Sequence, residues 1–188
     1  MQSHLKTSVV TDASRSILDT YKALAEELCR GLALFRETAE TILHGSTIHL
    51  MTQEPDDTAI HKHFFTALFL YSYYRAGILP ERRIIYTALN QCLRGMVTGC
   101  DNLLDDEYKV TLDTDLPASS RKFRSIIDIM VSNRAVASIL DKGFGHTLSR
   151  HELIEATFES LRTLTISMVE STIFFLVERL GVNKCVQF

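Results

Sequence analysis

The sequence has few of the residues that interrupt helices, since its 188 residues include only 8 glycines and 3 prolines. Those few fall between segments with helical periodicity, which is how an all-helical chain is punctuated. Segments with the two-residue alternation of a half-buried strand are absent as well. These absences argue against a β-rich fold and predict an all-α one, in a chain long enough for one hydrophobic core.

Other absences narrow the class of protein. The longest apolar run, residues 64–74, is too short to span a bilayer, so we expect no transmembrane segment. The first residues lack the apolar core of a signal peptide, and the 4 cysteines lack the spacing of a metal site, which together favour reduced thiols in a cytoplasmic protein. A net charge of −3 gives no reason to expect a nucleic-acid partner.

Turn and capping residues divide the chain into five expected helices. Gly45, Gly77 and Gly181 each follow a periodic segment, Pro80 suits a first helical turn, and Ser149 begins a capping-box sequence. The expected helices cover residues 12–44, 58–76, 80–109, 119–140 and 149–180, with a turn at 141–145. The second is apolar almost all round and is expected at the centre of the bundle. We therefore predict a single all-helical domain over residues 1–188, or an incomplete part of a longer one.

The end of the third expected helix carries the strongest chemical signal. Asp101 and Asp105 are four residues apart, so on a helix they lie one turn apart on the same face. Two carboxylates in this arrangement repel each other. Asp101 has no Lys or Arg four residues further on, whereas Asp105 has Lys109 at that spacing. A hard divalent cation held by carboxylate oxygens would neutralise both. We therefore predict that Asp101 and Asp105 are ligands of a Mg²⁺ ion.

The rest of that helix is apolar on both sides of a narrow polar stripe. The stripe consists of Gln91, Arg94, Thr98, Asp101 and Asp105. A helix of this kind is expected to be buried nearly all round, with its polar line facing a cavity. In the alternative interpretation, a buried Asp101 forms a structural ion pair with Arg94 or with Arg134.

Basic residues follow the acidic helix. Lys109 is next to its end, and Arg121, Lys122 and Arg124 occupy the start of the following helix, where the helix dipole prefers acids. Cations at that position make sense if an anion lies nearby. We predict that Lys109, Arg121 and Arg124 bind the phosphates of a substrate. The alternative is a solvated surface cluster without a function.

A known family shares this motif. The run Cys100-Asp101-Asn102-Leu103-Leu104-Asp105-Asp106-Glu107 resembles the first aspartate-rich motif, D-D-x-x-D, of trans-isoprenyl diphosphate synthases and related class I terpenoid synthases, with Asn102 where the second Asp is usual. The resemblance covers roughly residues 80–140. It implies an all-helical fold around a deep cavity, Mg²⁺ ions, ionisation and elongation of allylic prenyl diphosphates, and commonly a homodimer. By the same resemblance, Asp101 and Asp105 are the metal ligands, and Arg121 or Arg124 binds the allylic diphosphate.

Two parts of that family's pattern are absent. The chain has no G-K-x-R-P segment, which in the family helps to bind isopentenyl diphosphate, and no second D-D-x-x-D follows the first. The competing interpretation is a non-catalytic helical module, such as a regulatory subunit or an assembly domain. In that case its apolar helices would form a protein interface instead of a substrate cavity.

Overall fold

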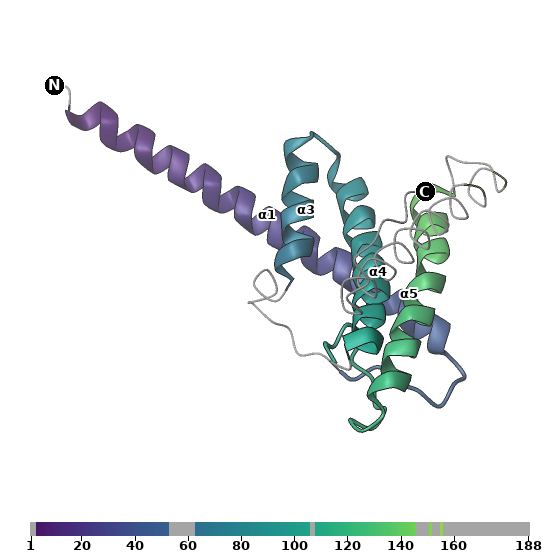
Figure 1. The fold of residues 1–188 in the computed structure, drawn as a ribbon. Coiled ribbons are helices and arrows are strands. Elements are labelled where there is room, and N and C mark those ends of the chain that lie inside the picture. Colours follow the sequence, from purple (N-terminus) through teal and green to yellow (C-terminus); the bar gives the residue numbers. More distant parts are fainter. Residues whose placement is uncertain (1–2, 53–62, 106–107, 146–150, 152–154, 156–188) are drawn as a thin grey trace, which may run out of the picture.

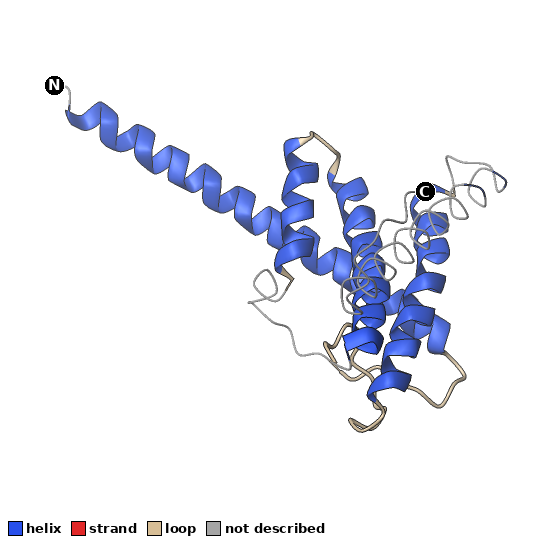
Figure 2. Cartoon of the chain, viewed as in Figure 1, coloured by secondary structure: helices blue, strands red, loops and turns tan. Residues whose placement is uncertain are grey.

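The computed structural model of the chain describes residues 3–52, 63–105, 108–145, 151 and 155. The described residues include these helices, in chain order: α1 (Ser3–Leu43), α3 (Phe64–Arg75), α4 (Pro80–Asp105) and α5 (Arg121–Phe144) (Figure 1). The described residues form no strand, only an isolated antiparallel bridge between Leu50 and Thr114 (Figure 2). The predicted all-α class is confirmed. The fifth predicted helix lies almost wholly outside the described residues.

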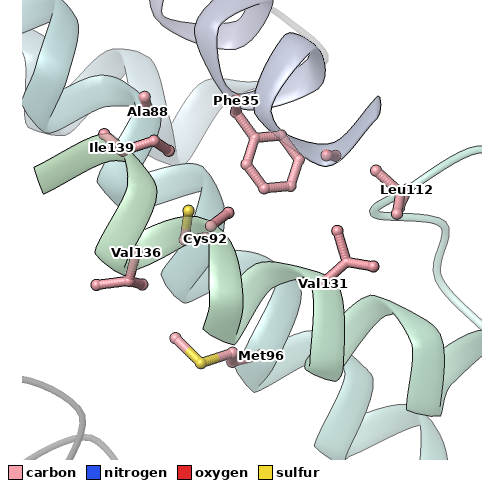
Figure 3. Packing of buried hydrophobic residues seen from close by; sticks show 10 residues of the cluster. Phe35, Ala88, Cys92, Met96, Leu112, Val131, Val136 and Ile139 are labelled. Atoms are coloured by element: carbon pink, nitrogen blue, oxygen red, sulfur yellow. The ribbon is translucent and has the colours of Figure 1, made fainter. Parts of the chain in front are cut away.

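Helices α3, α4 and α5 lie side by side, and α1 crosses behind them and contacts all three (Figure 1). The hydrophobic core lies where α1, α4 and α5 meet, with Leu112 added from the loop between α4 and α5 (Figure 3). Its members are Phe35, Ala39, Ala88, Cys92, Met96, Leu112, Val131, Ala135, Val136 and Ile139.

Two glycines let α4 and α5 approach closely. A Cβ on Gly95 would lie 2.0 Å from Oγ of Ser132, and one on Gly99 would lie 2.6 Å from Cγ1 of Ile129. Only hydrogen fits at either position, so these glycines determine which face of α4 meets α5. This side of α4, which was expected from the sequence to lie near a cavity, forms a helix–helix contact at both glycines.

Helix α1 begins at Ser3, before the predicted start at residue 12, and it is packed for only part of its length. Leu28, Phe35 and Ala39 are buried, whereas Ile17 and Tyr21 are exposed. The amino-terminal part of the helix extends beyond the other helices (Figure 1). Its periodicity is therefore that of a bundle helix, but the packing begins near Leu28.

An ion pair joins α1 to the start of α4. Arg83 donates from Nε to Oε2 of Glu27 at 2.7 Å and from Nη2 to Oε1 at 2.5 Å, and both residues are buried. Arg83 also donates to the backbone oxygen of Ile78. The hydrogen bond to Glu27 raises the pKa of Arg83 in spite of the opposing effect of burial. This two-point contact determines where α4 crosses α1.

Local signals predicted several helix ends correctly. Gly45 and Gly77 follow α1 and α3 with φ angles of 80° and 73°, a left-handed conformation that glycine adopts without strain. Pro80 is the first residue of α4. The predicted extension of α4 to Lys109 is wrong, because the helix ends at Asp105 and Lys109 lies in a loop.

The turn predicted at residues 141–145 is also wrong, since α5 continues to Phe144. Gly143 packs so closely on Ile85 that a Cβ there would lie 2.9 Å from its side chain. The ring of Phe144 stacks on Tyr86, with centroids 6.3 Å apart, and Arg82 lies over it at 4.3 Å. These contacts with α4 offset the cost of glycine in a helix, which is about 1 kcal/mol.

Helix α3 is not central in the described fold. Its buried residues are Thr66 and Leu70, and Tyr73 holds it to α4 through an edge-to-face contact with Tyr86. Most of its other aromatic side chains are exposed. Although it is the most apolar helix, neither it nor any other helix in the described ranges is long and apolar enough to cross a membrane.

Candidate functional site

The two predicted metal ligands lie in the last two turns of α4. Asp101 and Asp105 are both exposed, and within the described ranges neither forms an ion pair. The predicted burial of Asp101 is wrong, and the reason is its place on the helix. Asp101 is two residues beyond Gly99, which puts it on the side of α4 opposite the contact with α5.

Exposed apolar side chains flank this acidic pair. Val97 is one turn before Asp101 and 45% exposed, and Leu104 is one turn after it and 37% exposed. Residues at these spacings share one face of a helix. The carboxylates therefore lie in an exposed apolar strip, a surface that suits a ligand with both a charged and an apolar part.

The alternative structural ion pair is not formed in the described part of the chain. Arg94 lies two turns before Asp101 and donates from Nη1 to Nδ1 of His63 at 3.0 Å, at the start of α3. Because a guanidinium can only donate, Nδ1 of His63 must be the unprotonated acceptor. Burial lowers the pKa of Arg94. Arg134, the other proposed partner, is exposed on α5.

Asn102 has a role that the motif did not reveal. It is only 3% exposed, its Nδ2 donates to the backbone oxygen of Lys109 at 3.0 Å, and its Oδ1 accepts from the backbone nitrogen of Lys109 at 2.8 Å. Making both bonds requires a donor and an acceptor on one side chain, which an amide has and an ionised carboxylate lacks. This is a physical reason for Asn where the family's motif has a second Asp.

The loop after the acidic helix is held in place at several points. Leu112 is buried in the core, and Oγ1 of Thr111 donates to Oδ2 of Asp128 at 2.7 Å. Residues 49–51 pair with residues 113–115 through two backbone hydrogen bonds of 2.9 Å. Lys109 is therefore fixed through its backbone close to the acidic pair, and its side chain is exposed.

Of the predicted phosphate-binding residues, Arg124 has structural contacts. Its Nη2 donates to the backbone oxygen of Thr114 at 2.9 Å and lies 3.6 Å from Oδ1 of Asp113, and its guanidinium is 5.1 Å from the ring centre of Tyr108. Arg121 is exposed in the first turn of α5. Because α4 and α5 are antiparallel, Arg121 and Lys109 lie at the same end of the helix pair as the acids (Figure 1).

A buried acid beneath this loop was missed by the sequence reasoning. Asp128 is 0% exposed, and burial raises its pKa to about 6 against the opposing effects of the Thr111 hydrogen bond and the nearby Arg124. The available signal was an Asp on the apolar side of α5, next to Ile127 and one turn before Val131 and Ser132.

The described residues include no group of three or more His, Cys, Asp or Glu side chains placed to hold a metal ion. Asp106 and Glu107 of the motif lie outside the described residues. Two carboxylates are nevertheless a usual protein contribution to Mg²⁺, which keeps several water ligands. Comparisons of the chain with protein-family models, curated proteins and solved structures find no match. The family resemblance therefore depends on the motif residues alone.

Proposed function

We propose that the carboxyl-terminal end of α4 binds Mg²⁺ together with the diphosphate of an allylic prenyl diphosphate, and that the chain is a transferase of the isoprenoid diphosphate synthase type. The observation that supports this most is the position of Asp101 and Asp105, exposed and without an ion pair in the described ranges, within the apolar strip of Val97 and Leu104.

The chemistry of the strip matches an amphiphilic substrate. Carboxylate oxygens from Asp101 and Asp105 would take two positions on the cation, leaving others for water and for phosphate oxygens. Lys109 and Arg121, at the same end of the helix pair, would add positive charge beside the phosphates. Val97 and Leu104 would contact the start of the hydrocarbon chain.

The protein's contribution to the reaction would be positioning and charge. Bound Mg²⁺ would neutralise the negative charge that develops on a departing diphosphate. The hydrogen bonds of Asn102 hold the backbone of Lys109 in place next to the acidic turn, so its exposed side chain would add charge near the phosphates without movement of the loop. The proposed chemistry is ionisation of the allylic diphosphate followed by chain elongation.

Thermal unfolding of the full chain tests this proposal. A ligand that binds only the folded state raises the unfolding temperature, so farnesyl diphosphate should raise it in the presence of Mg²⁺ and not in EDTA. Asp101→Asn and Asp105→Asn should each abolish the ligand-dependent rise. Glu81→Gln, which removes an exposed acid at the other end of α4, is the matched control and should retain it.

Three results would contradict the proposal. One is no rise with farnesyl or geranyl diphosphate in excess Mg²⁺. A second is an equal rise in the Asp101→Asn variant and in the unchanged chain. If inorganic diphosphate stabilises as strongly as the prenyl compound, the apolar strip has no part in binding and the transferase proposal fails.

The second candidate function, a non-catalytic helical module, is favoured by the exposed face of α3. Phe64 and Phe65 are 61% and 72% exposed, and Leu68, Phe69, Tyr71 and Tyr74 are exposed too. A large apolar side chain has an accessible area of about 150–250 Å², and these side chains are about half exposed. Together they offer roughly 600 Å² of exposed apolar surface. A standard interface buries about 800 Å² on each partner, so α3 supplies most of what a homodimer needs.

Light scattering separates the two candidates. A module predicts a dimer that Phe65→Glu dissociates, with no response to Mg²⁺ or to prenyl diphosphates. A transferase predicts the ligand response whatever the oligomeric state, and Phe65→Glu then serves to show whether a homodimer uses α3. A monomer without a ligand response contradicts both.

A further inference from the structure

Four buried polar atoms near the loop after α4 have no hydrogen-bond partner among the described residues. They are Oη of Tyr108, Oγ1 of Thr114, Nε of Arg124 and Oδ1 of Asp128, here named the loop cluster. Thr114 is 4% exposed and Asp128 is 0% exposed, so bulk water does not reach them. An unsatisfied buried polar group destabilises a fold, and a charged one does so most. Each of these atoms therefore requires a partner.

The members of the loop cluster surround the side chain of Arg124. Its guanidinium is 5.1 Å from the ring centre of Tyr108, and its Nη2 donates to the backbone oxygen of Thr114 at 2.9 Å. Arg124 and Asp128 are four residues apart on α5, so they lie one turn apart on the same face. Burial and the charge of Asp128 raise the pKa of Tyr108, so these two groups are close as well. One ligand can therefore serve the whole cluster.

The chemistry of the four atoms defines what that ligand must do. Asp128 accepts one hydrogen bond, from Oγ1 of Thr111 to its Oδ2 at 2.7 Å. With a pKa of about 6 it is ionised at pH 7.5, and an ionised carboxylate can only accept. Nε of Arg124 can only donate, whereas the hydroxyls of Tyr108 and Thr114 can do both. The ligand must accept from Arg124 and donate to Asp128.

The charges of the cluster exclude an ion. A cation would be repelled by Arg124, and an anion would be repelled by Asp128. A neutral molecule avoids both penalties, and water is the smallest that donates and accepts at once. Buried water typically makes about three hydrogen bonds to protein groups that would otherwise be unsatisfied. The loop cluster offers that number of partners and one more.

We propose that an internal water molecule binds in the loop cluster, accepts a hydrogen bond from Nε of Arg124 and donates one to Oδ1 of Asp128. The hydroxyls of Tyr108 and Thr114 are its further partners. The water would connect the loop after α4, which carries both hydroxyls, to the first turns of α5. It would add to the direct bond between Thr111 and Asp128. The proposal does not depend on a metal ion or on a diphosphate.

Removing the two hydroxyls tests the proposal through the sign of the change in stability. Thr114→Val and Tyr108→Phe each remove a hydroxyl that no described protein group satisfies. If the hydroxyls bind water, each substitution loses a hydrogen bond, and the urea midpoint at pH 7.5 should fall by roughly 0.5 M. If the cluster is dry, each substitution removes an unsatisfied group, and the midpoint should rise.

Both substitutions preserve the other contacts of their residues. Valine retains the extended backbone that Thr114 adopts opposite Leu50, and phenylalanine retains the ring beside Arg124. The matched control is Tyr71→Phe, because Tyr71 is 47% exposed on α3 and loses its hydroxyl in contact with bulk solvent. The midpoint of this control should be almost unchanged.

A high-resolution crystal structure of the unchanged chain locates the ligand directly. We expect an electron-density peak for water within hydrogen-bond distance of both Nε of Arg124 and Oδ1 of Asp128. This measurement decides the question even if one of the substituted chains does not fold.

Two outcomes would overturn the proposal. In the first, the urea midpoint rises or stays the same in Thr114→Val or in Tyr108→Phe, so that hydroxyl does not bind water. In the second, the crystal structure shows no water in the cluster, or shows Nε of Arg124 donating directly to Asp128. Midpoints that fall in both variants, together with a density peak between Arg124 and Asp128, support the proposal.

Discussion

The two ends of α4 carry charged side chains in opposite environments. At the amino-terminal end, Arg83 is buried and makes two hydrogen bonds to Glu27. At the carboxyl-terminal end, Asp101 and Asp105 are exposed and have no ion pair within the described residues. A buried charge without a partner is costly, so the fold pairs the charge that it buries and leaves the others in water.

The comparison separates structural charges from charges that are available to a ligand. The pair at the start of α4 joins two helices and should be needed for stability. The acids at its end join nothing in the described fold, and their mutual repulsion slightly opposes folding. Substitutions at the start of α4 should therefore lower the free energy of unfolding, whereas substitutions of the acids at its end should change ligand binding and leave stability almost unchanged.

The strongest way to break the comparison is at the buried end. Glu27→Gln leaves the guanidinium of Arg83 buried without a charged partner and should lower the free energy of unfolding by about 3–5 kcal/mol, measured by urea denaturation. Glu40→Gln is the control. Glu40 is on α1, like Glu27, but it is exposed and its carboxylate lies 3.1 Å from Nε of Arg36. The cost of Glu40→Gln should be below about 1 kcal/mol. Equal losses in the two variants would contradict the comparison.

The next largest effect is expected at Asp128, a buried acid without the two-point partner that Arg83 has. Its signature is a free energy of unfolding that depends on pH. Its pKa is raised by burial from 3.8 to about 6 in the folded chain. A raised acid pKa means that the folded state resists ionisation. The contribution of Asp128 to stability is therefore greatest below pH 3.8 and falls as pH rises to about 6, by about 3 kcal/mol in total. Asp128→Asn should remove this fall.

Urea titrations of Asp128→Asn and the unchanged chain from pH 4 to pH 7.5 measure this effect. The variant should become the more stable of the two as pH rises, because Asn keeps an acceptor for Thr111 and carries no charge. The neighbouring Arg124 and Asp113 are present in both chains, so their effects cancel in the difference between the two titrations. A constant difference between the two chains would rule out a raised pKa for Asp128.

Asn102→Asp places a new carboxylate in a buried position next to the exposed acids. It introduces the second acid of the D-D-x-x-D pattern but removes the donor to Lys109 and buries a charge, so the free energy of unfolding should fall by about 1–3 kcal/mol at pH 7. A protonated carboxyl can donate again, so the loss should shrink at pH 4. Stability equal to that of the unchanged chain at pH 7 would mean that the Lys109 contact is not important.

The smallest effect is expected at the exposed end. Asp101→Asn should change the free energy of unfolding by no more than a few tenths of a kcal/mol, and in the stabilising direction, because it removes the repulsion with Asp105. The Mg²⁺-dependent response to farnesyl diphosphate should nevertheless disappear. A loss of more than about 1 kcal/mol would place Asp101 among the structural charges.

Helix ends and the helical class could be predicted because their signals are local. Gly45 and Gly77 stop helices through their own backbone conformations, and Pro80 starts one because it needs no hydrogen-bonded N–H there. Continuation of α5 through Gly143 could not be predicted, because it depends on Ile85 and Tyr86 of another helix. Local propensity was outweighed there by packing.

The candidate site was predictable in composition but not in environment. The four-residue spacing places Asp101 and Asp105 on one face of any helix, and the structure places Lys109 and Arg121 at the same end. The exposure of Asp101 and Asp105 depends on Gly95 and Gly99. Because these glycines have no side chains, the face of α4 that carries them packs on α5, and the acids lie on the other face.

The sequence by itself determined the helical class, the helix ends marked by Gly45, Gly77 and Pro80, and the one-turn spacing of the acidic pair. Periodicity, turn residues and helix geometry are properties of neighbouring residues. Only the tertiary structure decided which charges are buried and which are exposed. It also decided that Asn102 and Arg124 hold the loop and that Asp128 lies beneath it. Burial depends on which helix faces meet, and that is a property of the packed chain, which no single segment contains.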